Sequence, residues 1–123
     1  MLVVLVSCDP AYQVFIRNDL NENIVVTTVP SIESAFGRTS TVPLHISSTD
    51  SSGTYRFSPG DEMVIDVRMG FHPELERFPY RQVYLISSED TVVLDTKEKI
   101  LRSLVRIKRN RKFYVLLSKY FDK

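Results

Sequence analysis

The 123-residue sequence has a single cysteine, two histidines and no tryptophan. A lone cysteine cannot form an intramolecular disulfide, and it excludes a zinc site built from two pairs of cysteines. Long hydrophobic runs are also missing, since no segment approaches the roughly 20 apolar residues that a membrane-spanning helix needs. The sequence therefore predicts a fold held together by its hydrophobic core.

Alanine is scarce too, present only as Ala11 and Ala35, whereas Val, Ile, Thr, Tyr and Phe crowd the middle of the chain. Residues of the second group favour strands over helices. The length and the 43% hydrophobic content suit one two-layer domain. We expect a mainly β fold, an antiparallel β-sandwich or open barrel of about six to eight strands with one C-terminal helix before the last strand.

Alternating apolar and polar residues predict the first strand at residues 12–17, and a β-branched run predicts the second at 24–29. Residues 18–23 between them are rich in asparagine and acidic side chains, which favour turns. We therefore expect these two strands to form a hairpin. Further strands are expected at residues 42–47 (an edge strand), 55–57, 62–69, 82–86, 91–94 and 113–117.

The strand expected at residues 62–69 has a clear period of two. Met63, Ile65, Val67 and Met69 share one face, which we expect to lie on the core.

The connections between the later strands differ in length. Residues 70–79 contain two prolines and predict a long connection that crosses from one sheet to the other. Residues 87–90 suit a four-residue hairpin loop. Residues 31–40 read as a loop with one short helical turn around 32–36.

The strongest helical signal begins at Asp95, which stands three residues before Glu98 in the arrangement of a capping box. An apolar stripe at spacings of three and four follows, formed by Ile100, Leu101, Leu104 and Val105. Basic residues at 108–112 then suit the negative end of a helix dipole. We expect one helix that packs its stripe on the sheet.

Charge is distributed very unevenly along the chain. Residues 96–123 hold ten Lys and Arg against two acids, a net charge of +8, while residues 1–95 have a net charge of −7. Such segregation marks either a surface for an anionic partner or two oppositely charged faces of one domain that attract each other.

A basic run within this segment supplies the candidate anion-binding residues. They are Arg106, Lys108, Arg109, Arg111 and Lys112, with Phe113 and Tyr114 beside them as candidate stacking residues. A solvated turn would have the same composition. The sequence has no glycine-rich phosphate loop and no fingerprint of a nucleic-acid fold, so nucleic acid is not the partner we expect. For a membrane-anchored protein, anionic lipid headgroups are the expected partner of this run.

The segment Leu5-Val6-Ser7-Cys8 follows a short apolar run and precedes Asp9-Pro10. It resembles the lipobox of bacterial lipoproteins, with a branched apolar residue three positions before the cysteine and a small residue directly before it. The resemblance implies that Cys8 is acylated with diacylglycerol and becomes the mature amino terminus. Residues 1–8 would then end a signal peptide, and residues 9–123 would form the domain, tethered to a membrane of the bacterial cell envelope.

The region before the lipobox is shorter than a usual signal peptide and carries no positive charge, so we expect the true start codon to lie upstream. The alternative is that Val3–Val6 forms a buried strand and Cys8 is a small buried hydrophobe in a cytoplasmic protein.

Residues for catalysis are few. His45 and His72 lie in different segments and have no metal-ligand spacing, and there is no Gly-x-Ser-x-Gly motif. We therefore expect a binding or structural module without catalytic residues, metal or cofactor. The competing hypothesis is a small enzyme centred on His72 and the acids near it, in a long connection where functional groups often lie.

Overall fold

The computed structural model describes residues 11–36, 44–49, 51–107 and 111–121. The strands are β1 (Ala11–Arg17), β2 (Ile24–Val29), β3 (Leu44–Ser48), β4 (Gly53–Phe57), β5 (Glu62–Met69), β6 (Gln82–Ile86), β7 (Thr91–Leu94), β8 (Leu104–Val105) and β9 (Lys112–Leu116). The helical elements are α1 (Ile32–Ala35), α2 (Lys97–Arg102) and the 3₁₀ turn η1 (Leu117–Lys119). Eight of these strands have four or more residues, as expected, and the two-residue β8 is an addition.

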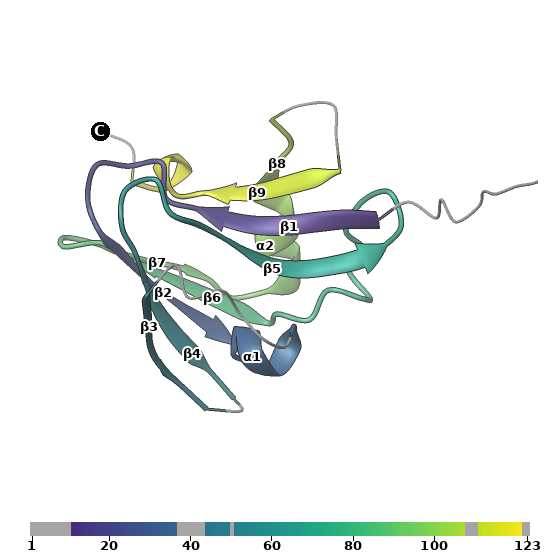
Figure 1. Ribbon diagram of the computed structural model, residues 1–123, viewed down its shortest axis with the longest axis horizontal. Coiled ribbons are helices and arrows are strands. Elements are labelled where there is room, and N and C mark those ends of the chain that lie inside the picture. Colours follow the sequence, from purple (N-terminus) through teal and green to yellow (C-terminus); the bar gives the residue numbers. More distant parts are fainter. Residues whose placement is uncertain (1–10, 37–43, 50, 108–110, 122–123) are drawn as a thin grey trace, which may run out of the picture.

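The strands pair into two sheets that face each other across one core (Figure 1). The first sheet has the order β5-β1-β9-β8, and the second has the order β3-β4-β2-β6-β7. Both sheets are open, so the expected β-sandwich is confirmed and the barrel alternative is not adopted. All pairs are antiparallel except β1 with β9, which run parallel.

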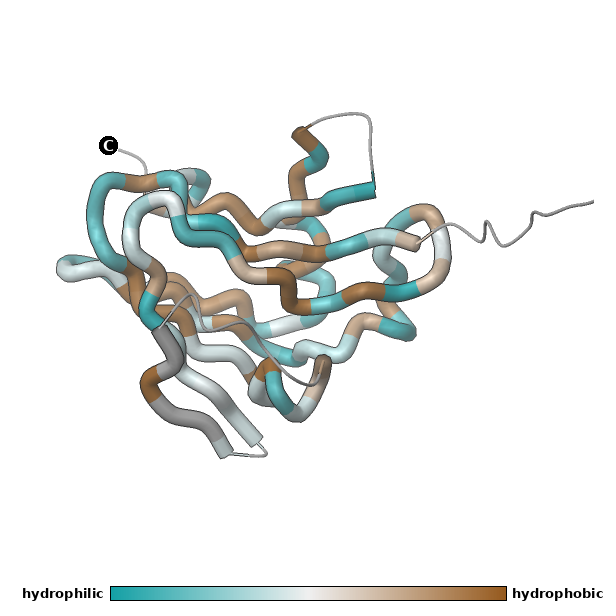
Figure 2. The backbone as a smooth tube through the Cα atoms, viewed as in Figure 1, coloured by the Kyte–Doolittle hydropathy of each residue, from teal (hydrophilic) through white to brown (hydrophobic). Residues whose placement is uncertain are grey.

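The core forms because the strands alternate as the sequence predicts. Figure 2 shows hydrophobic residues recurring along the strands of both sheets. Tyr12, Val14 and Ile16 of β1 are fully buried, and they face Val26 of β2 and Leu85 of β6 in the same cluster. Burying side chains of this size contributes about 1.5–3 kcal/mol each, which makes the shared core the main source of stability.

The expected hairpin between β1 and β2 is wrong, because the two strands belong to different sheets. The turn between them is instead a corner built on Asn18, whose side chain is fully buried. Its Nδ2 donates to the carbonyl oxygens of Glu22 (2.8 Å) and Phe57 (2.9 Å). Its Oδ1 accepts from the backbone N–H of Leu20 at 3.0 Å. These bonds turn the chain away from β1 and deliver it to the opposite sheet.

The predicted face of β5 is right in its first half and wrong in its second. Between Val14 and Phe15 of β1, the pairing partner jumps from Asp66 to Val64, so Ile65 is an extra residue in a β-bulge. Such a bulge re-aims the side chains that follow it. Met63 and Ile65 are therefore buried as expected, but Asp66 is buried next to them, while Val67 and Met69 are exposed.

The helix before the last strand is present but shorter than the apolar stripe implied. Its N-cap is Thr96, whose side chain accepts from the backbone N–H of Lys99, and not Asp95. It ends at Arg102 because the chain enters β8 at Leu104, so only Ile100 of the predicted stripe is a buried helical residue. α2 packs against β6 and β7.

The remaining connections agree with the sequence. The segment after β5 crosses from the first sheet to the second, and β6 and β7 form the expected hairpin around residues 87–90. The short helical turn is α1, and β3 is an edge strand.

Candidate functional site

The basic run flanks the start of β9, and its described cations lie over aromatic rings. The guanidinium of Arg111 lies 5.3 Å from the centroid of the Phe71 ring, and that of Arg106 lies 5.9 Å from the Phe113 ring. Lys112 Nζ lies 6.0 Å from the ring of Phe15. All three cations are exposed, whereas Lys108 and Arg109 lie outside the described residues.

The two aromatic residues beside this run pack against other rings of the first sheet. Phe113 meets Tyr12 edge-on, with ring centroids 6.3 Å apart. Tyr114 stacks on Phe15 at 5.1 Å and is only 7% exposed.

Of the two histidines, the structure describes the side chain of His72 alone. His72 is exposed in the connection after β5, where its Nδ1 lies 3.2 Å from the carbonyl oxygen of Pro73. The side chain of His45 lies outside the described residues, as does Cys8. In the part of the chain that the structure describes, no group of three His, Cys, Asp or Glu residues is arranged to hold a metal ion.

An open pocket of about 310 Å³ lies between the C-terminal part of α2 and η1. Its lining residues are Leu94, Lys99, Arg102, Ser103, Lys119 and Tyr120. The three cations are exposed, while Leu94 is buried and Tyr120 is half-buried. The pocket thus combines an apolar wall with three positive charges.

Contacts around the pocket hold two of its cations. Lys99 Nζ pairs with Asp95 Oδ1 at 2.9 Å, one turn earlier on the chain. Lys119 Nζ donates to the carbonyl oxygen of Ser103 at 3.4 Å. The acceptor in this bond is neutral, and Lys119 has no ion pair among the described residues. With Asp95 counted, the described residues at the pocket still have a net positive charge.

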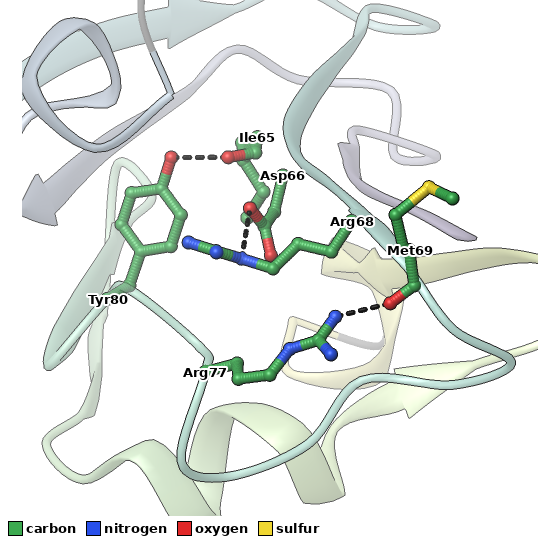
Figure 3. Close-up of polar contacts among 6 residues, drawn as sticks. All are labelled: Ile65, Asp66, Arg68, Met69, Arg77 and Tyr80. Atoms are coloured by element: carbon green, nitrogen blue, oxygen red, sulfur yellow. Dashed lines mark hydrogen bonds and ion pairs between the residues drawn. The ribbon is translucent and has the colours of Figure 1, made fainter. Parts of the chain in front are cut away.

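A second polar cluster lies where the β5–β6 connection leaves β5 (Figure 3). Its central group is the carboxyl of Asp66, which is 2% exposed because of the bulge at Ile65. Arg68 Nε lies 3.3 Å from Asp66 Oδ1, an ion pair without hydrogen-bond geometry. Asp66 Oδ2 has no hydrogen-bond partner among the described residues.

The connection is tied to β5 by two side chains that reach back to it (Figure 3). The hydroxyl of Tyr80 donates to the carbonyl oxygen of Ile65 at 2.6 Å, and Arg77 donates to the carbonyl oxygen of Met69. The hydroxyl of Tyr12 is buried without a partner in the described structure. We assign this cluster a structural role, because its bonds fix the course of the connection.

Burial raises the pKa of the Asp66 carboxyl above its ordinary value, and the positive charges of Arg68 and Arg77 oppose that shift. The pKa of Tyr12 is raised for the same reason, with a further contribution from the negative charge of Asp66. A buried acid with a raised pKa is a common feature of active sites. Among the described residues of the cluster, the other ionisable oxygens are the hydroxyls of Tyr12 and Tyr80.

Sequence reasoning missed both the pocket and the buried acid. Lys99, Arg102 and Lys119 all belong to the +8 segment, so its charge was the available signal. What the sequence did not reveal is that α2 and η1 meet, which brings cations 17 to 20 residues apart into one site. Asp66 had no signal at all, since its position in the alternation predicted an exposed side chain.

Comparisons of this chain with protein-family models, curated proteins and solved structures gave no match. Within the described residues, no helix has both the length and the apolar character needed to span a membrane.

Proposed function

We propose that the protein is a binding module of the bacterial cell envelope, without catalytic activity, that holds a small anionic ligand in the pocket between α2 and η1. The observation that carries the proposal is the combination of three cations with the apolar wall of Leu94 and Tyr120. A ligand that carries a phosphate, sulfonate or carboxylate on an apolar body matches both properties. Small-molecule sites typically combine an apolar lining with a few well-placed polar groups.

The same proposal includes a lipid anchor at Cys8, supported by the lipobox-like segment Leu5-Val6-Ser7-Cys8. Cleavage before Cys8 would leave every described element intact, because β1 begins at Ala11. The domain would therefore remain folded after processing.

Phenyl phosphate is a suitable probe for the pocket, with inorganic phosphate as the comparison. In amide NMR titrations, phenyl phosphate should shift the signals of Leu94, Ser103 and Tyr120, and it should bind more tightly than inorganic phosphate. Arg102→Gln should weaken this binding, and Arg81→Gln, which removes an exposed cation outside the pocket, should not. Equal shifts in both variants would refute the pocket as the binding site.

The anchor is tested in the native host with the gene and its upstream sequence. Cys8→Ser should move the protein from the membrane fraction to the soluble fraction, whereas Ser7→Ala keeps a small residue before the cysteine and should leave the protein on the membrane. Intact mass spectrometry should detect the acyl groups on Cys8. An unmodified Cys8 thiol in the native host would disprove the anchor and leave the pocket proposal standing.

A further inference from the structure

Three large hydrophobic side chains are exposed in succession where β5 ends. Val67 is 42% exposed, Met69 is 52% exposed and Phe71 is 64% exposed. Alternate residues of an extended chain point to the same side, so Val67 and Met69 lie together on the outer face of the first sheet. We call Val67, Met69 and Phe71 the apolar tip.

The apolar tip is a consequence of the β-bulge at Ile65. In a regular strand without the bulge, Val67 and Met69 would share the core face with Met63 and Ile65. The bulge instead sends Asp66 to the interior, at the cost of burying a carboxyl group, and sends these apolar residues outward. An exposed apolar cluster of this kind commonly marks a contact surface.

The apolar tip lies beside the first described residue of the chain. Ala11 pairs with Met69, and Gln13 pairs with Val67, in the antiparallel register of β1 and β5. Figure 1 shows the start of β1 next to the end of β5. Two residues, Asp9 and Pro10, separate Cys8 from Ala11, so the Cα atom of Cys8 lies within about 11 Å of the Cα atom of Ala11, whose partner in β5 is Met69.

Two cations, Arg111 and Lys112, lie beside the apolar tip. The guanidinium of Arg111 lies over the ring of Phe71, and the backbone N–H of Gln13 donates to the carbonyl oxygen of Arg111 at 2.8 Å. Lys112 pairs with Gln13 across the parallel β1–β9 contact. Both side chains are exposed.

We propose that the apolar tip, with Arg111 and Lys112, docks the domain on a bilayer that contains anionic lipid. Phe71 and Met69 enter the interface, and the two cations contact headgroup phosphates. The inference deepens the proposed function, because it rests on the anchor at Cys8 to hold this end of the domain at the membrane. A second copy of the chain is a poorer occupant, since a symmetric contact would bring Arg111 and Lys112 against their own copies.

The binding test uses the full chain carrying Cys8→Ser, so that it does not depend on lipidation. It should cosediment with phosphatidylcholine–phosphatidylglycerol vesicles, bind less to phosphatidylcholine alone, and be released by salt. Met69→Ser with Phe71→Ser should weaken binding by about tenfold or more. Arg111→Gln should weaken it by about fivefold. A matched control is Ile46→Ser with Val93→Ser, which alters similarly exposed residues of the second sheet and should have no effect.

A second measurement reports insertion directly. The chain has no tryptophan, so Phe71→Trp and Val93→Trp each give a single reporter. Brominated lipid should quench the fluorescence of the first and not of the second. Equal quenching of both would overturn the proposal, as would unchanged binding of the Met69→Ser/Phe71→Ser variant. The proposal would also be overturned if sedimentation showed a dimer that the Met69→Ser/Phe71→Ser variant dissociates, because the apolar tip would then be a contact between two copies of the chain.

The two proposals fail separately. If Cys8 is acylated but the unlipidated chain does not bind vesicles, docking is wrong and the anchor remains. If the unlipidated chain docks but Cys8 is unmodified in the host, the anchor alone is wrong.

Discussion

Asn18 offers the sharpest test of how this chain switches sheets. Replacing it with alanine removes the side chain that holds the β1–β2 corner, while the backbone bonds of Asn18 to Asp61 and Gly60 (both 2.8 Å) stay available. The variant therefore isolates the amide side chain. If this side chain directs β2 to the second sheet, its loss should destabilise the whole fold and not only a surface loop.

The expected magnitude follows from the three hydrogen bonds of the side chain. A hydrogen bond contributes about 1 kcal/mol net, and a buried group left without a partner costs about 1–3 kcal/mol. The bond to the carbonyl oxygen of Phe57 is buried, while those to Glu22 and Leu20 are partly buried. Asn18→Ala should therefore lower the free energy of unfolding by about 3 kcal/mol.

Urea unfolding followed by circular dichroism measures this difference directly, provided that the slope with denaturant is unchanged. Asn21→Ala is the matched control, because Asn21 is exposed in the same turn and should change stability by less than about 0.5 kcal/mol. A loss below about 1 kcal/mol for Asn18→Ala, or equal losses for the two variants, would refute the role of Asn18 in the corner.

Two further predictions concern the cluster around Asp66. Burial raises the pKa of this carboxyl, so the native state keeps its proton to higher pH than the unfolded chain does, and stability falls as pH rises through that raised pKa. The free energy of unfolding of Asp66→Asn, measured relative to that of the unmodified protein, should thus increase from pH 3 to pH 7. Urea titrations of both proteins at each pH measure this difference, and a difference that does not change with pH would contradict the reasoning. Tyr80→Phe loses the buried hydrogen bond to the carbonyl oxygen of Ile65 and should lower the free energy of unfolding by about 1–2 kcal/mol. Tyr12→Phe removes a hydroxyl without a partner in the described structure and should lower it by less than about 0.5 kcal/mol. Thermal denaturation of both variants tests this, and a larger loss for Tyr12→Phe would contradict it.

The strands were predictable because each depends on a local pattern. The burial pattern of β1 reproduces the alternation of residues 12–17, and the β6–β7 hairpin follows from a four-residue loop between two apolar runs. Here the local preference and the tertiary fold agree, so a period-two pattern suffices to identify the strands.

The pairing of the strands was less predictable. The composition of the turn-rich segment after β1 is compatible both with a hairpin and with a connection to the other sheet. The difference lies in Asn18, whose partner Phe57 is 39 residues away. The parallel pairing of β1 with β9 is equally non-local, since it joins the two ends of the described chain. A single sequence contains no signal of either contact.

For the candidate site, the sequence supplied only the concentration of positive charge in residues 96–123. In the structure, the described cations of the +8 segment are divided between two surfaces. Arg111 and Lys112 flank the start of β9, whereas Lys99, Arg102 and Lys119 line the pocket. That division depends on where α2 ends and on the contact of α2 with η1, and neither follows from composition.

The two cationic surfaces lie at opposite ends of β9, so docking through one of them determines where the other lies relative to the membrane. Arg111 stands directly before β9 and Lys119 lies in η1 directly after it, so the five residues of β9 separate them by about 17 Å. A domain docked through Phe71 and Arg111 would therefore hold the η1 side of the pocket away from the bilayer. In that orientation the cations at the start of β9 contact lipid, while Lys119 stays in contact with the aqueous phase. The pocket would then take a dissolved anionic ligand, and the same headgroups that hold the apolar tip would not compete for it.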